Sequence, residues 1–373
     1  GAIDVLMGGG TQTQNDYLSA QAGEQVPAYR GVVSLVLRQV YLGINPYLKP
    51  LAVRVSRVLT RNDNQGQWLA NLAEIWPDVG DELSAQVIGP DMNPVHILRE
   101  CITDVGWGMG YNDADIGASF AAAAQVLHDE GFGLSFLWQK EGTVEDFISD
   151  VLKHIDASVY VDPRTGLWEI KLIRGDYEIA NLPVFDDSNV IDWGELALTE
   201  GGQVNQIVVE YSDLRNDKVG TVSVTDTALV QLAGQVISTK ISYLGVRAEA
   251  LAVRLAERDL RALSSAIWSG EITVNRQGSG LAPGAAVRVN SPTRGIDDIV
   301  FRVSEVDQGD GRSNGVRLTV AQDVFALGAT ASVGGAITAP SPIPLPRCRQ
   351  WGGHGAPFAL RRCWRCVVIQ TAC

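Results

Sequence analysis

Apolar residues recur at helical spacing in three stretches near the middle of the chain. The first stretch follows Asn93-Pro94, which is typical of an N-cap residue and a first-turn proline, and we expect Gly106 to end it as a C-terminal cap. The second stretch begins at Asp115 as its N-cap, and the third begins at the cap Thr143. The apolar positions of the three predicted helices are, in chain order, Leu98, Cys101, Ile102 and Val105; Ile116, Phe120, Ala123 and Leu127; and Val144, Phe147, Ile148, Val151 and Ile155.

Alternation of apolar and polar residues predicts strands on both sides of these helices. Residues 157–173, "ASVYVDPRTGLWEIKLI", predict a hairpin whose turn carries Asp162 and Gly166. The stretches "EITVNRQ", "AAVRVN", "DIVFRVSEVD" and "GVRLTVAQD" predict a small antiparallel barrel or sandwich near the C-terminal end. The other predicted strands are 29–42, 51–60, 134–139, 203–213 and 218–226.

A longer helix is predicted over residues 246–263, just before the strands of the barrel. We expect its arginines to face the outside of the molecule or a neighbouring protein, because they fall opposite its apolar positions. The predicted inward residues are Val253, Ala256, Leu260 and Leu263, and the predicted outward residues are Arg247, Arg254, Arg258 and Arg261.

Three glycines surround a tryptophan and a methionine in Gly106-Trp107-Gly108-Met109-Gly110. A dinucleotide loop needs G-x-G-x-x-G after a strand, whereas this stretch follows a predicted helix. A phosphate-binding Walker loop ends in Gly-Lys-Ser/Thr, and that sequence is absent here. The pattern therefore favours a tight loop that places Trp107 and Met109 in the core.

The composition is ordinary for a globular protein, with 46% hydrophobic and 20% charged residues. No apolar run reaches the roughly 20 residues of a membrane helix, and the N-terminus lacks the basic start and apolar stretch of a signal peptide. A first residue that is glycine instead of methionine is compatible with a fragment. The net charge of −13 argues against a surface that grips nucleic acid, which needs clustered lysine and arginine.

The last stretch, residues 341–373, differs abruptly from the rest of the chain. It contains no acidic residue and four of the five cysteines. This change favours a frameshifted, artificial or disordered tail. The alternative is a zinc site built from Cys348, His354, Cys363 and Cys366, whose spacing matches no familiar zinc motif.

The residues suited to catalysis are few, and we predict no catalytic, cofactor-binding or metal-binding residues. No H-E-x-x-H motif pairs two of the four histidines, and surface positions are expected for His96, His128 and His154. Ser119 lies in "GASFA", which lacks the closing glycine of a nucleophile elbow. "DADIG", residues 113–117, resembles only the start of a calcium loop.

The order of these elements resembles the tip attachment protein (protein J) family of long-tailed phages. It also resembles the related tail proteins of prophages and gene transfer agents. Each single motif is loose, but their shared order over roughly residues 26–325 is fairly specific. The residues that carry the resemblance are Asn93, Pro94, Gly106, Trp107, Gly108, Met109, Gly110, Asp115, Phe147, Ile148, Asp162 and Gly166.

The resemblance implies an α+β fold with β-barrel-like tube domains and an inserted small α/β domain, as in baseplate hubs. It implies a non-enzymatic homotrimer at the tail tip of a virion, which closes the tail tube and docks on distal tail and tail tube proteins. DNA would pass through its lumen without being gripped, and regions outside this chain would contact the host receptor. A tail-associated cell-wall hydrolase and a non-phage β-rich binding module remain alternatives. The expected segments are 1–90 (β-rich), 91–175 (α/β), 176–328 (barrel-like, with helix 246–263) and 329–373 (linker and tail).

Overall fold

The computed structural model describes residues 2–40, 68–80, 89–137, 142–198, 204–213, 218–309 and 312–326. The predicted strand 51–60 and the cysteine-rich tail 341–373 lie outside these residues. The chain divides into two units: Gly1–Arg57 with Gly355–Cys373, and Val58–His354. We describe each unit by itself.

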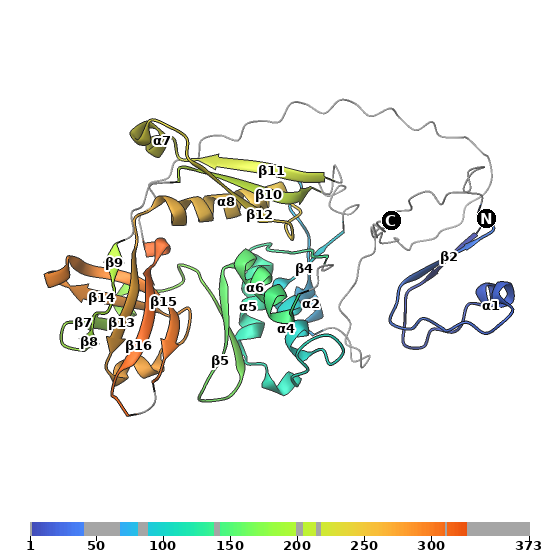
Figure 1. Cartoon of the computed structure of the whole chain (residues 1–373), viewed down its shortest axis with the longest axis horizontal. Helices are drawn as coiled ribbons and strands as arrows, with labels where there is room; N and C mark the ends of the chain where they lie inside the picture. Colours follow the sequence, from blue (N-terminus) through green and yellow to red (C-terminus); the bar gives the residue numbers. More distant parts are fainter. Residues whose placement is uncertain are drawn as a thin grey trace. The chain divides into compact units, whose positions relative to one another are not determined.

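The described residues of the first unit, 2–40, form a two-stranded antiparallel ribbon and one short helix. Strand β1 (Ala2–Leu6), which the sequence pattern did not predict, pairs with β2 (Ser34–Arg38), and helix α1 (Asp16–Ala22) lies between them in the chain (Figure 1). Asn15 caps α1 by accepting from the Leu18 N–H (3.0 Å), and its own amide donates to Asp4 (2.8 Å). Asp4 thereby ties the helix to the ribbon.

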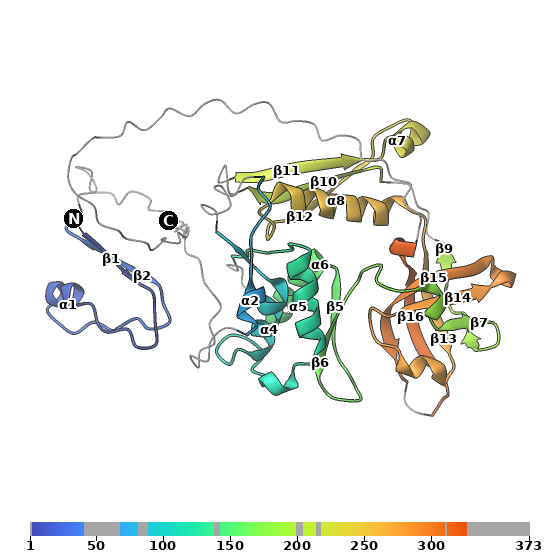
Figure 2. The same ribbon diagram turned by 180° about the vertical axis from the view of Figure 1, so that it is seen from behind.

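The described part of the second unit begins with an α/β block that contains three longer helices, the one-turn helix α2 and a hairpin. Figures 1 and 2 both show α4, α5 and α6 gathered beside the hairpin. The helices bury their apolar faces in one core, so the helical periodicity of the sequence is confirmed. The elements are α2 (Ala70–Ala73), β3 (Glu74–Ile75), β4 (Asp91–Met92), α4 (Pro94–Thr103), η1 (Asp113–Asp115), α5 (Ser119–Asp129), α6 (Val144–Ile155), β5 (Ala157–Val161) and β6 (Trp168–Leu172).

Two predicted boundaries in this block are wrong. Helix α4 ends at Thr103, because the extended backbone of Asp104 leaves the helix (φ −69°, ψ 127°). Val105 is consequently 83% exposed and does not extend the apolar face. Of the predicted strand 134–139, only Leu134 forms a bridge, to Met92, among the residues described there.

A three-stranded sheet covered by a long helix follows in the chain. Strand β10 (Gln206–Asp213) pairs antiparallel with β11 (Lys218–Thr225), as predicted, and parallel with the unpredicted β12 (Ser238–Tyr243). A short helix, α7 (Thr227–Ala233), connects β11 to β12. Helix α8 (Glu249–Ser264) lies along this sheet in both ribbon views.

The buried face of α8 differs from the predicted one. Ala256 and Leu260 are buried as expected, whereas Leu263 is exposed and Val253 is half-buried. The helix instead turns a neighbouring face toward the sheet, and that face adds Leu251, Ala252 and Leu255 to the core.

The last part of the second unit is a nearly closed barrel-like sheet of seven strands. Its order is β7-β14-β15-β16-β13-β8, with β9 also paired to β13. Strands β7 and β8, at the two ends of this order, are joined by only three residues, so the sheet curls back on itself. Its core is made of alternating residues such as Val287, Val289, Phe301 and Leu318, which confirms the predicted antiparallel β-structure. The bounds are β7 (Val184–Asp186), β8 (Val190–Asp192), β9 (Ala197–Leu198), β13 (Trp268–Val274), β14 (Ala286–Ser291), β15 (Ile296–Asp307) and β16 (Val316–Gln322).

The structure is therefore mixed helix and sheet with a barrel-like sheet. The four segments expected from the sequence, 1–90, 91–175, 176–328 and 329–373, stay a prediction. No helix among the described residues is long and apolar enough to cross a membrane.

Candidate functional site

Asn93, one of the residues that carry the resemblance, is buried and makes three side-chain hydrogen bonds. Its side chain is fully buried, and its Oδ1 accepts from the Val95 N–H (3.1 Å), which caps α4 as predicted. Its amide group also donates to the Leu72 carbonyl (3.0 Å) and the Ala124 carbonyl (2.8 Å). One side chain thus joins α2, α4 and α5, and Pro94 occupies the first turn of α4.

The glycine-rich stretch forms a loop that folds back onto the end of α4. We call residues 104–111 the capping loop, because the N–H groups of Met109 and Tyr111 donate to the carbonyls of Cys101 (2.8 Å) and Ile102 (3.0 Å). These carbonyls would otherwise lack partners at the end of the helix. Trp107 and Met109 are half-buried and pack against the main core, as expected from the sequence.

The role predicted for Gly106 is wrong, whereas Gly108 and Gly110 permit the tight loop as expected. Gly106 does not adopt the left-handed conformation of a C-terminal cap, because the Asp104 side chain accepts from the N–H groups of Gly106 (2.7 Å) and Trp107 (3.1 Å) and turns the chain there. Gly108 passes so close to α4 that a Cβ atom would lie 2.6 Å from the Cys101 carbonyl oxygen. Gly110 has a φ of +76°, in the left-handed region that favours glycine.

Asp115 is not the N-cap of α5, which corrects a second prediction. It closes the 3-10 turn η1, where its side chain accepts from the Asn112 N–H (2.9 Å). The neighbouring Asp113 forms an ion pair with the buried Arg99. Both carboxylates of the "DADIG" segment are thus engaged with protein donors.

Helix α5 receives its cap from a residue fifty positions later in the chain. Its N-cap, Ala118, has no polar side chain, and Glu169 of β6 accepts from both the N–H (3.3 Å) and the hydroxyl of Ser119. The Ser119 hydroxyl in turn accepts from the Ile170 N–H (2.9 Å). A Cβ atom at Gly117 would collide with the Glu169 carboxylate. Ser119 therefore links α5 to the hairpin, and the partners of its hydroxyl are the Glu169 carboxylate and the Ile170 N–H.

The hairpin β5–β6 forms as predicted, in a register that pairs Ala157 with Leu172. Asp162 shapes its turn, since its carboxylate accepts from the Arg164 N–H (2.9 Å) and its carbonyl accepts from the Gly166 N–H (2.7 Å). Gly166 has a φ of +72° and could not be replaced there without strain. The Arg164 side chain extends to the Ser279 carbonyl of the barrel (3.2 Å).

Two of the three described histidines are buried, which contradicts the surface positions predicted for them. His96 and His154 are each only 5% exposed. Burial lowers the pKa of both, and that of His154 falls to about 4. His128, at the end of α5, remains partly exposed beside Asp129. No two of these rings lie in contact, so they offer no paired base or metal ligand.

Two of the four arginines predicted to form an outward row, Arg247 and Arg258, turn inward, which corrects the prediction for them, whereas Arg254 is exposed and Arg261 is half-buried. Arg247 forms an ion pair with Asp91, which is 3% exposed, and donates to the Gly89 carbonyl (2.9 Å). Arg254 donates to the Glu130 carbonyl (2.8 Å), and Arg258 donates to the His154 carbonyl (2.9 Å). These bonds cross from the α8 region to the α/β block, so we call this contact the arginine seam.

Sequence reasoning missed several charged partners that hold the second unit together. Asp91 also accepts from the Ser135 hydroxyl (2.7 Å), and burial raises its pKa despite the neighbouring arginine. Arg302 of β15 pairs with Asp323 at the end of β16 (2.6 Å) and joins the barrel to the rest of the unit through the Arg174 carbonyl (2.8 Å). Nothing in the local sequence pattern distinguishes these residues from surface charges.

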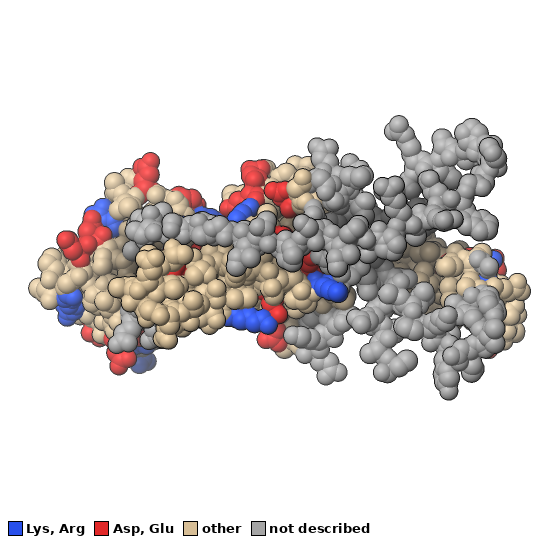
Figure 3. All heavy atoms as spheres, turned by 90° about the horizontal axis from the view of Figure 1, so that it is seen from above, with Lys and Arg blue, Asp and Glu red and all other residues tan. Residues whose placement is uncertain are grey.

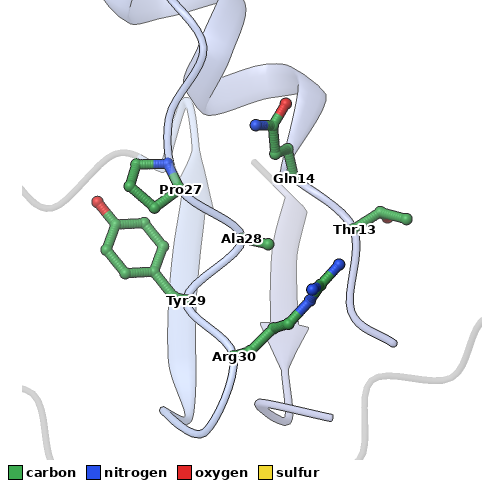
Figure 4. Close-up of a pocket in the computed structure, with 6 residues that line it drawn as sticks. All are labelled: Thr13, Gln14, Pro27, Ala28, Tyr29 and Arg30. Carbon is green, nitrogen blue, oxygen red and sulfur yellow. The ribbon is translucent and has the colours of Figure 1, made fainter. Parts of the chain in front are cut away.

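Little in the described residues suits chemistry on a small molecule. No group of three or more histidine, cysteine, aspartate or glutamate residues is placed to hold a metal ion there. Cys101 is buried, and burial raises the pKa of its thiol to about 12. A surface hollow in the first unit contains no acid, histidine or cysteine (Figure 4). It is lined by Thr13, Gln14, Pro27, Ala28, Tyr29 and Arg30.

Comparisons with known proteins find similarity at the level of solved structures. No family model and no curated protein sequence matches the chain. A structure described as the virion of a native gene transfer agent particle aligns over 88% of this chain and 73% of its own, with 16% identity and a TM-score of 0.47.

Two further solved structures that align with the chain are tail proteins. One is the tail protein from Neisseria meningitidis MC58 (15% identity, TM-score 0.35), and the other is the 43 kDa tail protein of prophage MuSo2 from Shewanella oneidensis (13% identity, TM-score 0.34). Each alignment covers 51% of this chain, which spans 58% and 57% of those two proteins. All three TM-scores lie below 0.5.

Proposed function

We propose that the chain is a structural component of a phage-type tail, at the tail tip, in the manner of a baseplate hub or tip attachment protein. The proposal rests on one observation: the residues that carry the resemblance have structural roles in the fold. Asn93, Gly108, Gly110, Asp162 and Gly166 all shape the backbone of one folded block. A family pattern preserved by such residues fits a scaffold better than a reaction centre.

In this proposal the chain assembles as a homotrimer at the end of the tail tube and docks on distal tail and tube proteins. Receptor binding belongs to regions outside this chain. The net charge of −13 fits a lumen through which DNA slides without being held. Among the described residues visible in Figure 3, basic side chains are scattered among acidic ones and form no continuous patch, which supports this part of the proposal.

Size-exclusion chromatography with light scattering tests the assembly, and a peptidoglycan-clearing assay on the same fractions tests the hydrolase alternative. We expect a mass of three chains, or larger rings, and no clearing. A monomer that clears the suspension would favour the hydrolase. A monomer without activity would favour a binding module.

A further inference from the structure

His154, in the last turn of α6, is buried at the arginine seam, where its ring faces the sheet that carries α8. Its ring meets the rings of Phe136 and Tyr243 edge to face, with centroids 4.9 Å away in both cases. Nδ1 lies 2.6 Å from the Asp150 carbonyl oxygen. Because a carbonyl can only accept, Nδ1 carries the proton of the neutral ring, and the lone pair remains on Nε2. Nε2 is buried and has no hydrogen-bond partner.

The backbone of His154 is bonded across the same seam. Arg258 of α8 donates to the His154 carbonyl (2.9 Å) and to the Tyr243 hydroxyl of β12 (3.0 Å). Tyr243 in turn donates to Asp259 of α8 (2.7 Å). One histidine therefore lies where α6, β12 and α8 meet, and any movement of its ring disturbs all three elements.

A second proton on this ring would have no place in the closed seam. It would add an N–H at Nε2 that has no acceptor, and a positive charge near Arg258 and Lys153, which both oppose protonation. The Asp150 carbonyl and carboxylate favour the charged ring, but the cost of burial is larger. The charged and titratable groups that face His154 are Asp150 and Lys153 of α6, Tyr243 of β12 and Arg258 of α8. Behind them, Asp156 and Asp259 lie beside Arg258, and Phe136 contributes no charge.

We propose that His154 is an acid-sensitive latch: its neutral ring lets the α/β block pack against the β10–β12 sheet, and its protonation opens the arginine seam. The latch depends only on this joint and not on the proposed function in a tail. In a particle it would loosen the subunit in an acidified medium.

The pH range of the latch follows from linkage. Burial depresses the pKa of His154 from 6.5 in the unfolded chain to about 4 in the folded chain. The stabilisation of the closed seam is fully present above the unfolded pKa and is lost as the pH falls toward the folded pKa. Opening should therefore rise by up to about tenfold per pH unit between these two values, because opening takes up one proton.

Hydrogen exchange of the full chain, corrected for the intrinsic pH dependence of exchange, tests the latch. Protection of the α6 and β12 peptides is measured across this pH range for the wild type, His154→Phe and His128→Gln. Phenylalanine preserves the ring packing but cannot be protonated, and His128 is a matched control outside the seam. As the pH falls, opening in the wild type should increase by about tenfold per pH unit more than opening in H154F, which lacks the titrating ring. H128Q should show the same pH dependence as the wild type.

Equal pH dependence in wild type and H154F would overturn the proposal. Should H154F fail to fold, an NMR titration of histidine carbons in the wild-type chain decides the question. A His154 midpoint near 4 supports the latch, whereas a midpoint near 6.5 would contradict it.

Discussion

Alanine substitutions at the three glycines of the capping loop distinguish two reasons why a glycine is needed. Gly108 lies too close to the backbone of α4 for a Cβ atom, and Gly110 adopts a left-handed conformation. At Gly108 the new Cβ would lie 2.6 Å from the Cys101 oxygen and 2.8 Å from the Asp104 oxygen, and neither backbone atom can yield without moving α4 or the loop. Retreat of the loop would break the two hydrogen bonds from Met109 and Tyr111 to α4. With about 1 kcal/mol for each bond and at least about 1 kcal/mol for the overpacking, G108A should cost about 3 kcal/mol.

The two neighbouring glycines provide graded controls. Gly110 has open space around its Cβ position but a positive φ, so G110A should cost about 1–2 kcal/mol through backbone strain. Gly106 has neither constraint, since its Cβ would meet only the Asp104 side chain at 3.2 Å, and G106A should stay within about 0.5 kcal/mol.

Urea denaturation followed by circular dichroism, with hydrogen exchange of peptides from residues 94–111, measures these differences. The expected order of cost is G108A, then G110A, then G106A. If G106A were as damaging as G108A, Gly106 would be the helix cap after all and the geometry of the loop would be wrong. A G108A chain as stable as wild type would refute the close approach to α4.

Four further outcomes follow from the structure. Asn93→Ala should lower the free energy of unfolding by about 3 kcal/mol in urea denaturation, because it removes a cap and two buried donors, whereas the exposed cap variant Asn112→Ala should cost about 1 kcal/mol or less. Trp107→Ala should cost about 2 kcal/mol in the same assay, less than the roughly 3–5 kcal/mol of a fully buried aromatic, since Trp107 is only half-buried; no measurable loss would show that its packing is incidental. Arg247→Met should lower the free energy of unfolding by about 3–5 kcal/mol, because it leaves the buried Asp91 without its ion-pair partner. Adding Asp91→Leu should restore much of this loss, and a double variant no more stable than the single one would contradict the prediction. In fluorescence anisotropy at about 0.15 M salt, duplex DNA should not bind; micromolar, salt-sensitive affinity would reveal a basic surface.

The elements that local pattern determines were predictable from the sequence. Helix α6 has an apolar stripe and a capping box between Thr143 and Asp146. Both features lie within the short stretch from Thr143 to Ile155, so they can be recognised from local sequence alone. The turn of the β5–β6 hairpin depends on Asp162 and Gly166, which lie four residues apart. The barrel strands were likewise visible through their alternation, because each strand has one face in the core.

The residues that the sequence pattern misassigned depend on partners far along the chain. Helical spacing places Arg247 and Arg258 on a polar face, but it cannot show that this face meets Asp91 and the His154 carbonyl. The cap of α5 comes from Glu169, fifty residues after Ser119, whereas the local sequence pattern favours Asp115. Such residues become visible only when the fold places distant segments together.

Immunogold electron microscopy of purified particles, with antibodies raised against this chain, tests the central claim most directly. Particles from a bacterium that produces the protein are labelled intact, and the position of the gold along the particle is scored. The account predicts gold at the distal end of the tail, and no labelling of particles from a strain in which the coding sequence is deleted. Gold on the head or along the whole tail, or a chain found only in the cell lysate and absent from particles, would contradict it.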